Sequence, residues 1–131
     1  MLAKSIGEYL QGKGIVTNTN YYIDFLPPSP DDATGIFSSG GYPVDGKEGY
    51  DEPTIQVVSR ARLSENAYTK SAQIYSELHG LNTVTLADGT HIVNCLGMQS
   101  SPQNLGRDVD GRTEYVVNYR FRVRNKTVHR V

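Results

Sequence analysis

The chain has 131 residues, of which 37% are hydrophobic and 21% are charged. This composition suits one compact domain and leaves no room for two independent cores. The single cysteine, Cys95, excludes an internal disulfide, and the net charge of −1 argues against attraction of the whole surface to nucleic acid or anionic lipid. No apolar stretch is long enough to span a membrane, and polar residues interrupt residues 1–12 where a signal peptide would be apolar. We therefore expect an unprocessed cytosolic product.

Charge is divided unevenly along the chain. Residues 1–52 contain three lysines and eight carboxylates, a net charge of −5, so the remainder carries +4. Such asymmetry suits head-to-tail packing of copies, with an acidic surface against a basic one, and it is equally compatible with a solvated dipolar surface.

The N-terminal part predicts one helix, strand segments and a long connection. Residues 2–11 place apolar side chains at helical spacing before a Gly-Lys-Gly stop, which predicts a short amphipathic helix. Residues 15–26 are rich in β-branched and aromatic side chains and end at Pro27-Pro28, which predicts one strand or two short ones. Residues 28–52 are rich in Gly, Pro and Asp and predict a mobile surface loop, interrupted by a brief strand at 35–37.

The middle of the chain predicts a strand followed by the clearest helix. Residues 53–62 alternate apolar and polar side chains, which indicates one buried face and places Arg60 and Arg62 on the wetter side. Ser64 has the short polar side chain typical of a helix N-cap, apolar residues then recur at helical spacing, and Gly80 supplies a stop. The helix is expected over 65–79.

The last fifty residues predict antiparallel hairpins. Asp88-Gly89 and Asp110-Gly111 tolerate positive φ in tight turns, and strands are expected on both sides of each. Residues 82–86 would pair with 90–96, and the final strand, 113–124, alternates an apolar face with a strongly basic one.

The order of elements predicts an α+β fold: an antiparallel β-sheet with a long helix packed on one face and a short N-terminal helix. The side chains expected in the core are Ile55, Val57, Ile74, Leu78, Val117, Tyr119 and Phe121.

Catalysis and metal binding have no support in the sequence. The three histidines lack metal-ligand spacing, and neither a Ser nucleophile elbow nor a Cys-His signature is present, so we expect no enzyme, no metal and no cofactor. Cys95 lies in an alternating apolar run, which is typical of a buried structural thiol. Residues 108–111 faintly resemble a calcium loop, but the ligand positions do not align, and a hairpin turn explains them better.

The strongest charge feature is the series Arg120, Arg122 and Arg124, because period-two spacing puts all three on one side of a strand. Three interpretations stay open: a grip on phosphates, contact with acidic residues of a neighbouring copy, and a solvated edge that prevents aggregation. Tyr119 and Phe121 point to the other side, which counts against base stacking beside the arginines. The candidate interface residues are Arg60, Arg62, Arg120, Arg122, Arg124, Asp51 and Glu52.

Three segments carry a family resemblance: residues 51–60 (DEPTIQVVSR), the helix end at 78–80 (LHG) and residues 105–119 (LGRDVDGRTEYVVNY). Together with the order of elements, they resemble the minor capsid and tail terminator proteins of long-tailed bacteriophages over almost the whole chain. Residues 38–50 match no pattern of this family.

The resemblance implies one tail-terminator-like domain over 1–131 in a structural protein of the virion, assembled in the host cytoplasm. Such proteins form a homo-oligomeric ring, typically of six, that caps the tail tube protein, stops its polymerisation and meets the head-completion protein. DNA passes through the ring lumen without specific binding, and no membrane is involved. A head-side connector or stopper is the alternative of the same class. A small nucleic-acid-binding module that uses the arginine series is the alternative of another class.

Overall fold

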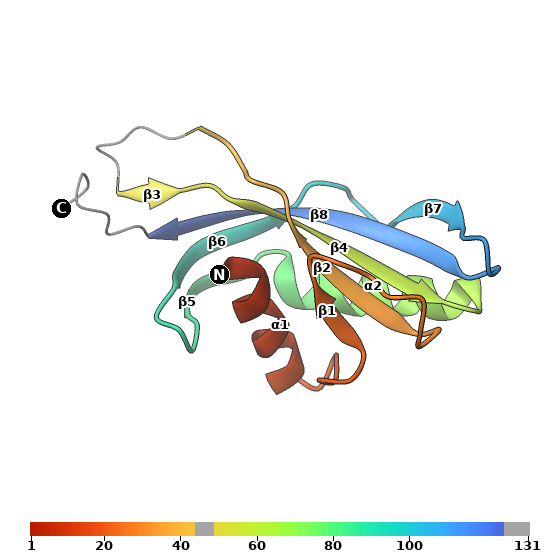
Figure 1. Ribbon diagram of the computed structural model, residues 1–131. Coiled ribbons are helices and arrows are strands. Elements are labelled where there is room, and N and C mark those ends of the chain that lie inside the picture. The colour runs from red at the N-terminus through yellow and green to blue at the C-terminus, as the bar shows by residue number, and fades with distance from the viewer. Residues whose placement is uncertain (44–48, 125–131) are drawn as a thin grey trace.

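The computed structural model describes residues 1–43 and 49–124 (Figure 1). In chain order the elements are α1 (Leu2–Gly12), β1 (Tyr21–Ile23), β2 (Ala33–Ser38), β3 (Tyr50–Asp51), β4 (Thr54–Ala61), α2 (Ser64–Leu78), β5 (Asn82–Thr85), β6 (His91–Gly97), β7 (Gln103–Arg107) and β8 (Thr113–Arg124). The α+β class is confirmed.

The strands form one mixed sheet with the order β1-β2-β4-β8-β6-β5, and β3 and β7 also pair with β8. All pairs are antiparallel except β1 with β2, which is parallel, so the expected antiparallel sheet has one exception. β4 and β3 follow one another along one side of β8, and β7 and β6 follow one another along the other. β8 is therefore the central strand, and its bounds agree with the predicted 113–124.

The core lies on one face of the sheet, where α1 and α2 both pack (Figure 1). All seven side chains expected in the core are buried. Tyr119 and Phe121 are completely inaccessible beneath the centre of β8, and Ile74 and Leu78 of α2 meet them from the helix side. From Val117 onward, alternation along β8 thus buries the odd-numbered residues and turns Arg120, Arg122 and Arg124 to the opposite face.

The opposite face is covered at one end only. Because β1 and β2 are parallel neighbours, residues 24–32 must cross a face of the sheet to join them. They cross on the side away from the helices, where Pro30 and Asp31 receive hydrogen bonds from Arg60 of β4. Val116 of β8 is buried on this side as a result. The other end of this face has no such cover within the described chain.

The N-terminal half differs from the sequence-based prediction. The strand expected at 15–26 is reduced to the three residues of β1, and Asp24 directly after it has a φ of 64°. The loop expected at 28–52 contains β3 and a six-residue β2, and its residues 44–48 lie outside the described part. β2 starts with Ala-Thr-Gly, a weak strand signal, and forms because it pairs along its whole length with β4.

The helix and hairpin boundaries are close to those predicted. α2 begins at Ser64, with Leu63 at the N-cap and no side-chain capping bond, so the capping role predicted for Ser64 is wrong. Gly80 follows the helix with a φ of 84°, as expected of a glycine stop. The Asp88-Gly89 and Asp110-Gly111 turns join β5 to β6 and β7 to β8.

Candidate interface at the uncovered end of the sheet

The predicted interface residues fall into two groups at opposite ends of β8. In the pairing of β4 with β8, Arg60 lies opposite Glu114, whereas Arg120 lies opposite Thr54. Six residues of strand separate the two positions, about 20 Å. The structure brings Asp51 and Glu52 to the end that carries Arg120, and it leaves Arg60 and Arg62 at the other.

Arg60 is buried at the covered end, with 4% of its surface exposed. Its Nη2 donates to the carbonyl of Pro30 at 2.6 Å, and its Nε donates to the carbonyl of Asp31 at 3.2 Å. Burial lowers the pKa of the Arg60 guanidinium, although nearby carboxylates oppose that shift. The prediction that Arg60 lies on the wetter side is wrong, because residues 24–32 cover this part of the face.

Arg112 is equally buried and was not recognised from the sequence. Its Nη2 lies 2.8 Å from Asp108 Oδ2, its Nη1 lies 3.5 Å from Asp31 Oδ1, and it also donates to the carbonyl of Pro28. The hydrogen bond that Arg112 donates to the Asp108 carboxylate raises the pKa of Arg112. These bonds fasten the β7–β8 turn to residues 24–32. A signal was visible in the sequence, since Asp108 and Arg112 bracket the Asp-Gly turn.

The exposed Arg62 joins this group, because its Nε donates to Asp31 Oδ2 at 2.9 Å. We call the group the arginine–aspartate brace and define it as Arg60, Arg62, Arg112, Asp31, Asp108 and Asp110.

Within residues 1–43 and 49–124, no three His, Cys, Asp or Glu side chains are arranged to hold a metal ion.

At the uncovered end, the arginines of β8 lie on tyrosine rings. The guanidinium carbon of Arg120 is 4.2 Å from the centre of the Tyr42 ring, and those of Arg122 and Arg124 lie 4.7 and 5.5 Å from that of Tyr50. A guanidinium stacked on a ring keeps its N–H donors in its own plane, where they can still bind a carboxylate or phosphate.

Glu52 takes part in this arrangement within the same chain. Its Oε2 accepts a hydrogen bond from Arg120 Nη2 at 2.7 Å. Sequence analysis named Asp51 and Glu52 among the candidate interface residues. Glu52 is paired within its own chain, and contact of either carboxylate with a neighbouring copy stays a prediction.

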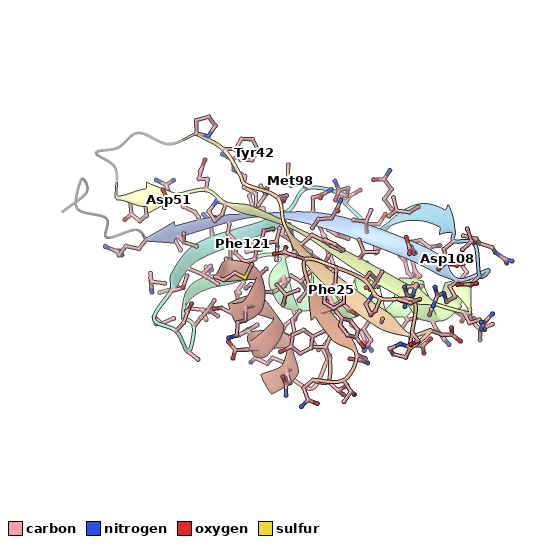
Figure 2. All side chains as sticks on the ribbon, viewed as in Figure 1. Phe25, Tyr42, Asp51, Met98, Asp108 and Phe121 are labelled. Carbon is pink, nitrogen blue, oxygen red and sulfur yellow. The ribbon has the colours of Figure 1, made fainter. Side chains whose placement is uncertain are left out.

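Exposed apolar side chains surround these arginines. Leu96 lies opposite Arg120 in the pairing of β6 with β8 and is 50% exposed, and Met98 is 46% exposed. Tyr42 and Met98 lie on the side of the sheet away from Phe121 and the helices (Figure 2). We call this surface the open face and define it as Tyr42, Tyr50, Leu96, Met98, Arg120, Arg122 and Arg124.

A small pocket of about 220 Å³ lies within the open face. Its lining comes from the turn after β2, from β4, from the residue after β6 and from the middle of β8: Ser39, Gly41, Tyr42, Thr54, Met98 and Asn118. The sequence analysis missed the pocket and both tyrosines, because they reach the arginines only through loop closure.

The open face has the composition of a protein interface. Tyr, Met and Arg are enriched at such interfaces, whereas nucleic-acid-binding surfaces are more polar and much more positively charged. This composition is typical of a surface that recognises another protein, and a partner that fits it would offer carboxylates beside an apolar side chain.

Comparison with known proteins identifies the class of assembly. A family model described as bacteriophage tail terminator protein matches residues 9–125. The chain belongs to this family. It is therefore a structural protein of a virion tail, and its family is not one of enzymes. The resemblance inferred from the sequence is confirmed. No helix of the described chain is long and apolar enough to cross a membrane.

One solved structure, described as the virion of a native gene transfer agent particle, contains a chain with the same fold. The TM-score is 0.61 over 95% of this chain and 95% of that one, at 19% sequence identity. A comparison with curated protein sequences gives no match.

Proposed function

We propose that this protein is the tail terminator itself: copies form a ring, typically of six, that caps the tail tube, stops its polymerisation and joins the tail to the head-completion protein. Membership of the tail terminator family supports this role. A ring needs a heterologous contact, in which one surface of each copy meets a different surface of the next. The uneven charge of the chain suits such a contact.

The observation that carries the proposal is the open face. Arg120 is held between the ring of Tyr42 and the carboxylate of Glu52, so it loses little conformational freedom when a partner binds. Leu96 and Met98 beside it remain accessible. A surface with fixed arginines and exposed apolar side chains is suited to a partner protein with acidic groups.

The nucleic-acid alternative gains one observation from the structure. Tyr42 and Tyr50 lie beside the arginines of β8. The aromatic residues next to these arginines along β8, Tyr119 and Phe121, are instead buried in the core. Aromatic rings beside arginines are a feature of single-strand binding sites. The exposed Leu96 and Met98 favour a protein partner instead.

The proposal is tested by adding purified protein to polymerising tail-tube protein and imaging the products by electron microscopy. We expect tubes that stop growing and carry a ring at one end. Arg120→Glu with Arg122→Glu should abolish capping, whereas Lys4→Glu on α1, on the helix side of the sheet, should leave it intact. Tubes that grow equally long with and without the protein would refute the role. DNA binding that weakens steeply with added salt would favour the nucleic-acid module.

A further inference from the structure

Val109 is fully exposed at the tip of the β7–β8 hairpin. Asp110 follows it. Its side chain is 58% exposed, although its Oδ2 lies 3.3 Å from Arg112 Nη2 of the same chain. The tip therefore presents one apolar side chain next to one carboxylate. That pair is what the open face is expected to bind.

Hydrogen bonds within the β7–β8 turn hold the tip in place. Asp108 Oδ1 accepts hydrogen bonds from the backbone N–H groups of Asp110, at 3.0 Å, and Arg112, at 2.9 Å. The backbone of the turn closes twice more, through Asp108 N to Arg112 O and Gly111 N to Asp108 O. The buried Arg112 ties Asp108 to Asp31. Val109 consequently occupies a fixed position before any partner arrives, which limits the entropy lost on binding.

The pocket of the open face is complementary to the side chains at this tip in size and polarity. Tyr42 and Met98 supply apolar walls, and Thr54 and Asn118 supply polar lining. Its volume of about 220 Å³ accommodates a side chain of the size of valine. Arg120, two residues along β8 from Asn118 and on the same face, lies beside it.

The tip and the pocket lie at different places along the same strand, so they cannot meet within one chain. Gly111 and Asn118 are seven residues apart along the chain, roughly 23 Å in extended conformation. Figure 2 shows Asp108 at one end of the molecule and Met98 well away from it. Two complementary surfaces at different sites of one subunit make the heterologous contact from which rings are built.

We infer that Val109 of each copy inserts into the pocket between Tyr42 and Met98 of the next copy, and that Asp110 meets the arginines of the open face there. This inference rests on the proposed ring and names the contact that would close it. Asp110 then supplies these arginines with a carboxylate from the neighbouring copy, in addition to Glu52 of their own chain.

Cysteine cross-linking tests this contact. Two single variants, Val109→Cys and Met98→Cys, carry tags of different mass and are mixed under mild oxidation, both free in solution at high concentration and with tail tubes. We expect a disulfide-linked pair that contains one copy of each variant, because a bridge needs Cα atoms within about 7 Å. The native Cys95 is buried, and burial raises its pKa to about 12, so it does not compete.

Three controls sharpen the result. Each variant alone should give no cross-link, and the Val109→Cys, Met98→Cys double variant should give a series of oligomers that ends at the ring size. Val109→Asp should keep native circular dichroism, since the side chain is exposed, and should reduce the ring-bound fraction at least tenfold. Val109→Ala should reduce it less.

The mixture overturns the inference if it cross-links no more than the single variants do, with or without tubes. Cross-linking of Val109→Cys with itself would also overturn it, because the tips would then meet each other. Capping of tubes is scored separately. Capped tubes without the cross-link refute the contact and leave the terminator role, whereas the cross-link without capping supports the contact and refutes that role.

Discussion

At one end of β8, Arg60 and Arg112 are buried among carbonyl and carboxylate oxygens, and at the other end Arg120 remains 42% exposed above a tyrosine ring. The residue type is the same, and Arg60 of β4 and Arg120 of β8 lie on the same face of the sheet. What differs is whether another segment lies over that face. Residues 24–32 cross it at the first end, and no described segment crosses it at the second. The comparison shows that an arginine on a strand face becomes structural or available according to a distant segment, which its own position in the strand does not reveal.

The largest expected effect is loss of stability at the covered end. Arg60→Ala leaves the carbonyls of Pro30 and Asp31 without their buried donor, so we expect the free energy of unfolding to fall by about 2–4 kcal/mol. Urea denaturation measures it. Arg62→Ala is the matched control, since that exposed side chain should matter much less. Equal losses of unfolding free energy in the two variants would mean that the burial of Arg60 does not increase its contribution to stability.

At the open face we expect loss of assembly without loss of fold. Arg120→Glu with Arg122→Glu should change the free energy of unfolding by only about 1 kcal/mol, because exposed ion pairs and cation–π contacts contribute little. Circular dichroism should stay native while capping of tail tubes is lost. A double variant that caps tubes normally would show that these arginines are solvated edge charges.

Acid should weaken the brace. The hydrogen bond from Arg62 lowers the pKa of Asp31, and the backbone N–H of Arg112 lowers that of Asp108. At the β5–β6 turn, the Ser5 hydroxyl lowers the pKa of Asp88 to about 2. A pKa that is lower in the folded state means that folding favours the ionised form. Stability from these groups should be complete above about pH 4 and fall as the pH drops toward 2.

The measurement for this prediction is the thermal midpoint between pH 6 and pH 2, for the wild type and for Asp108→Asn. The variant should start lower and lose less on acidification, because it no longer has that carboxylate to protonate. Parallel curves for the two proteins would mean that Asp108 is not coupled to folding.

The smallest effect is expected between the two ends, on the core side of β8. The Tyr119 hydroxyl is buried and has no hydrogen-bond partner among the described residues, and burial raises its pKa. Tyr119→Phe removes a polar group that gains nothing from being buried. We expect the free energy of unfolding to rise by less than about 1 kcal/mol in urea denaturation. A clear loss would reveal a partner of the hydroxyl.

Local patterns were sufficient where the chain's own periodicity decides the structure. The course of β8 follows from apolar and polar side chains that alternate over residues 117–124, and the hairpins follow from their Asp-Gly turns. The core positions of α2 follow from helical spacing. These features need no knowledge of distant segments.

Non-local contacts decided the rest. β2 becomes a strand by pairing with β4, and residues 24–32 bury Arg60 from the far side of the sheet. Tyr42 and Tyr50 reach the arginines of β8 from a connection that sequence analysis treated as a loop. The local sequence of these segments contains no pattern that predicts these contacts. The arginine series was therefore found as a candidate site, whereas its aromatic partners and its pocket were not.

The most direct test of the account is the length of tails made in cells that produce the phage without this protein. We expect tail tubes of uncontrolled length and heads without tails in electron micrographs. Supplying the wild-type chain should restore uniform tails, and supplying Arg120→Glu with Arg122→Glu should not. Tails of normal, uniform length in the absence of the protein would contradict its role as a terminator.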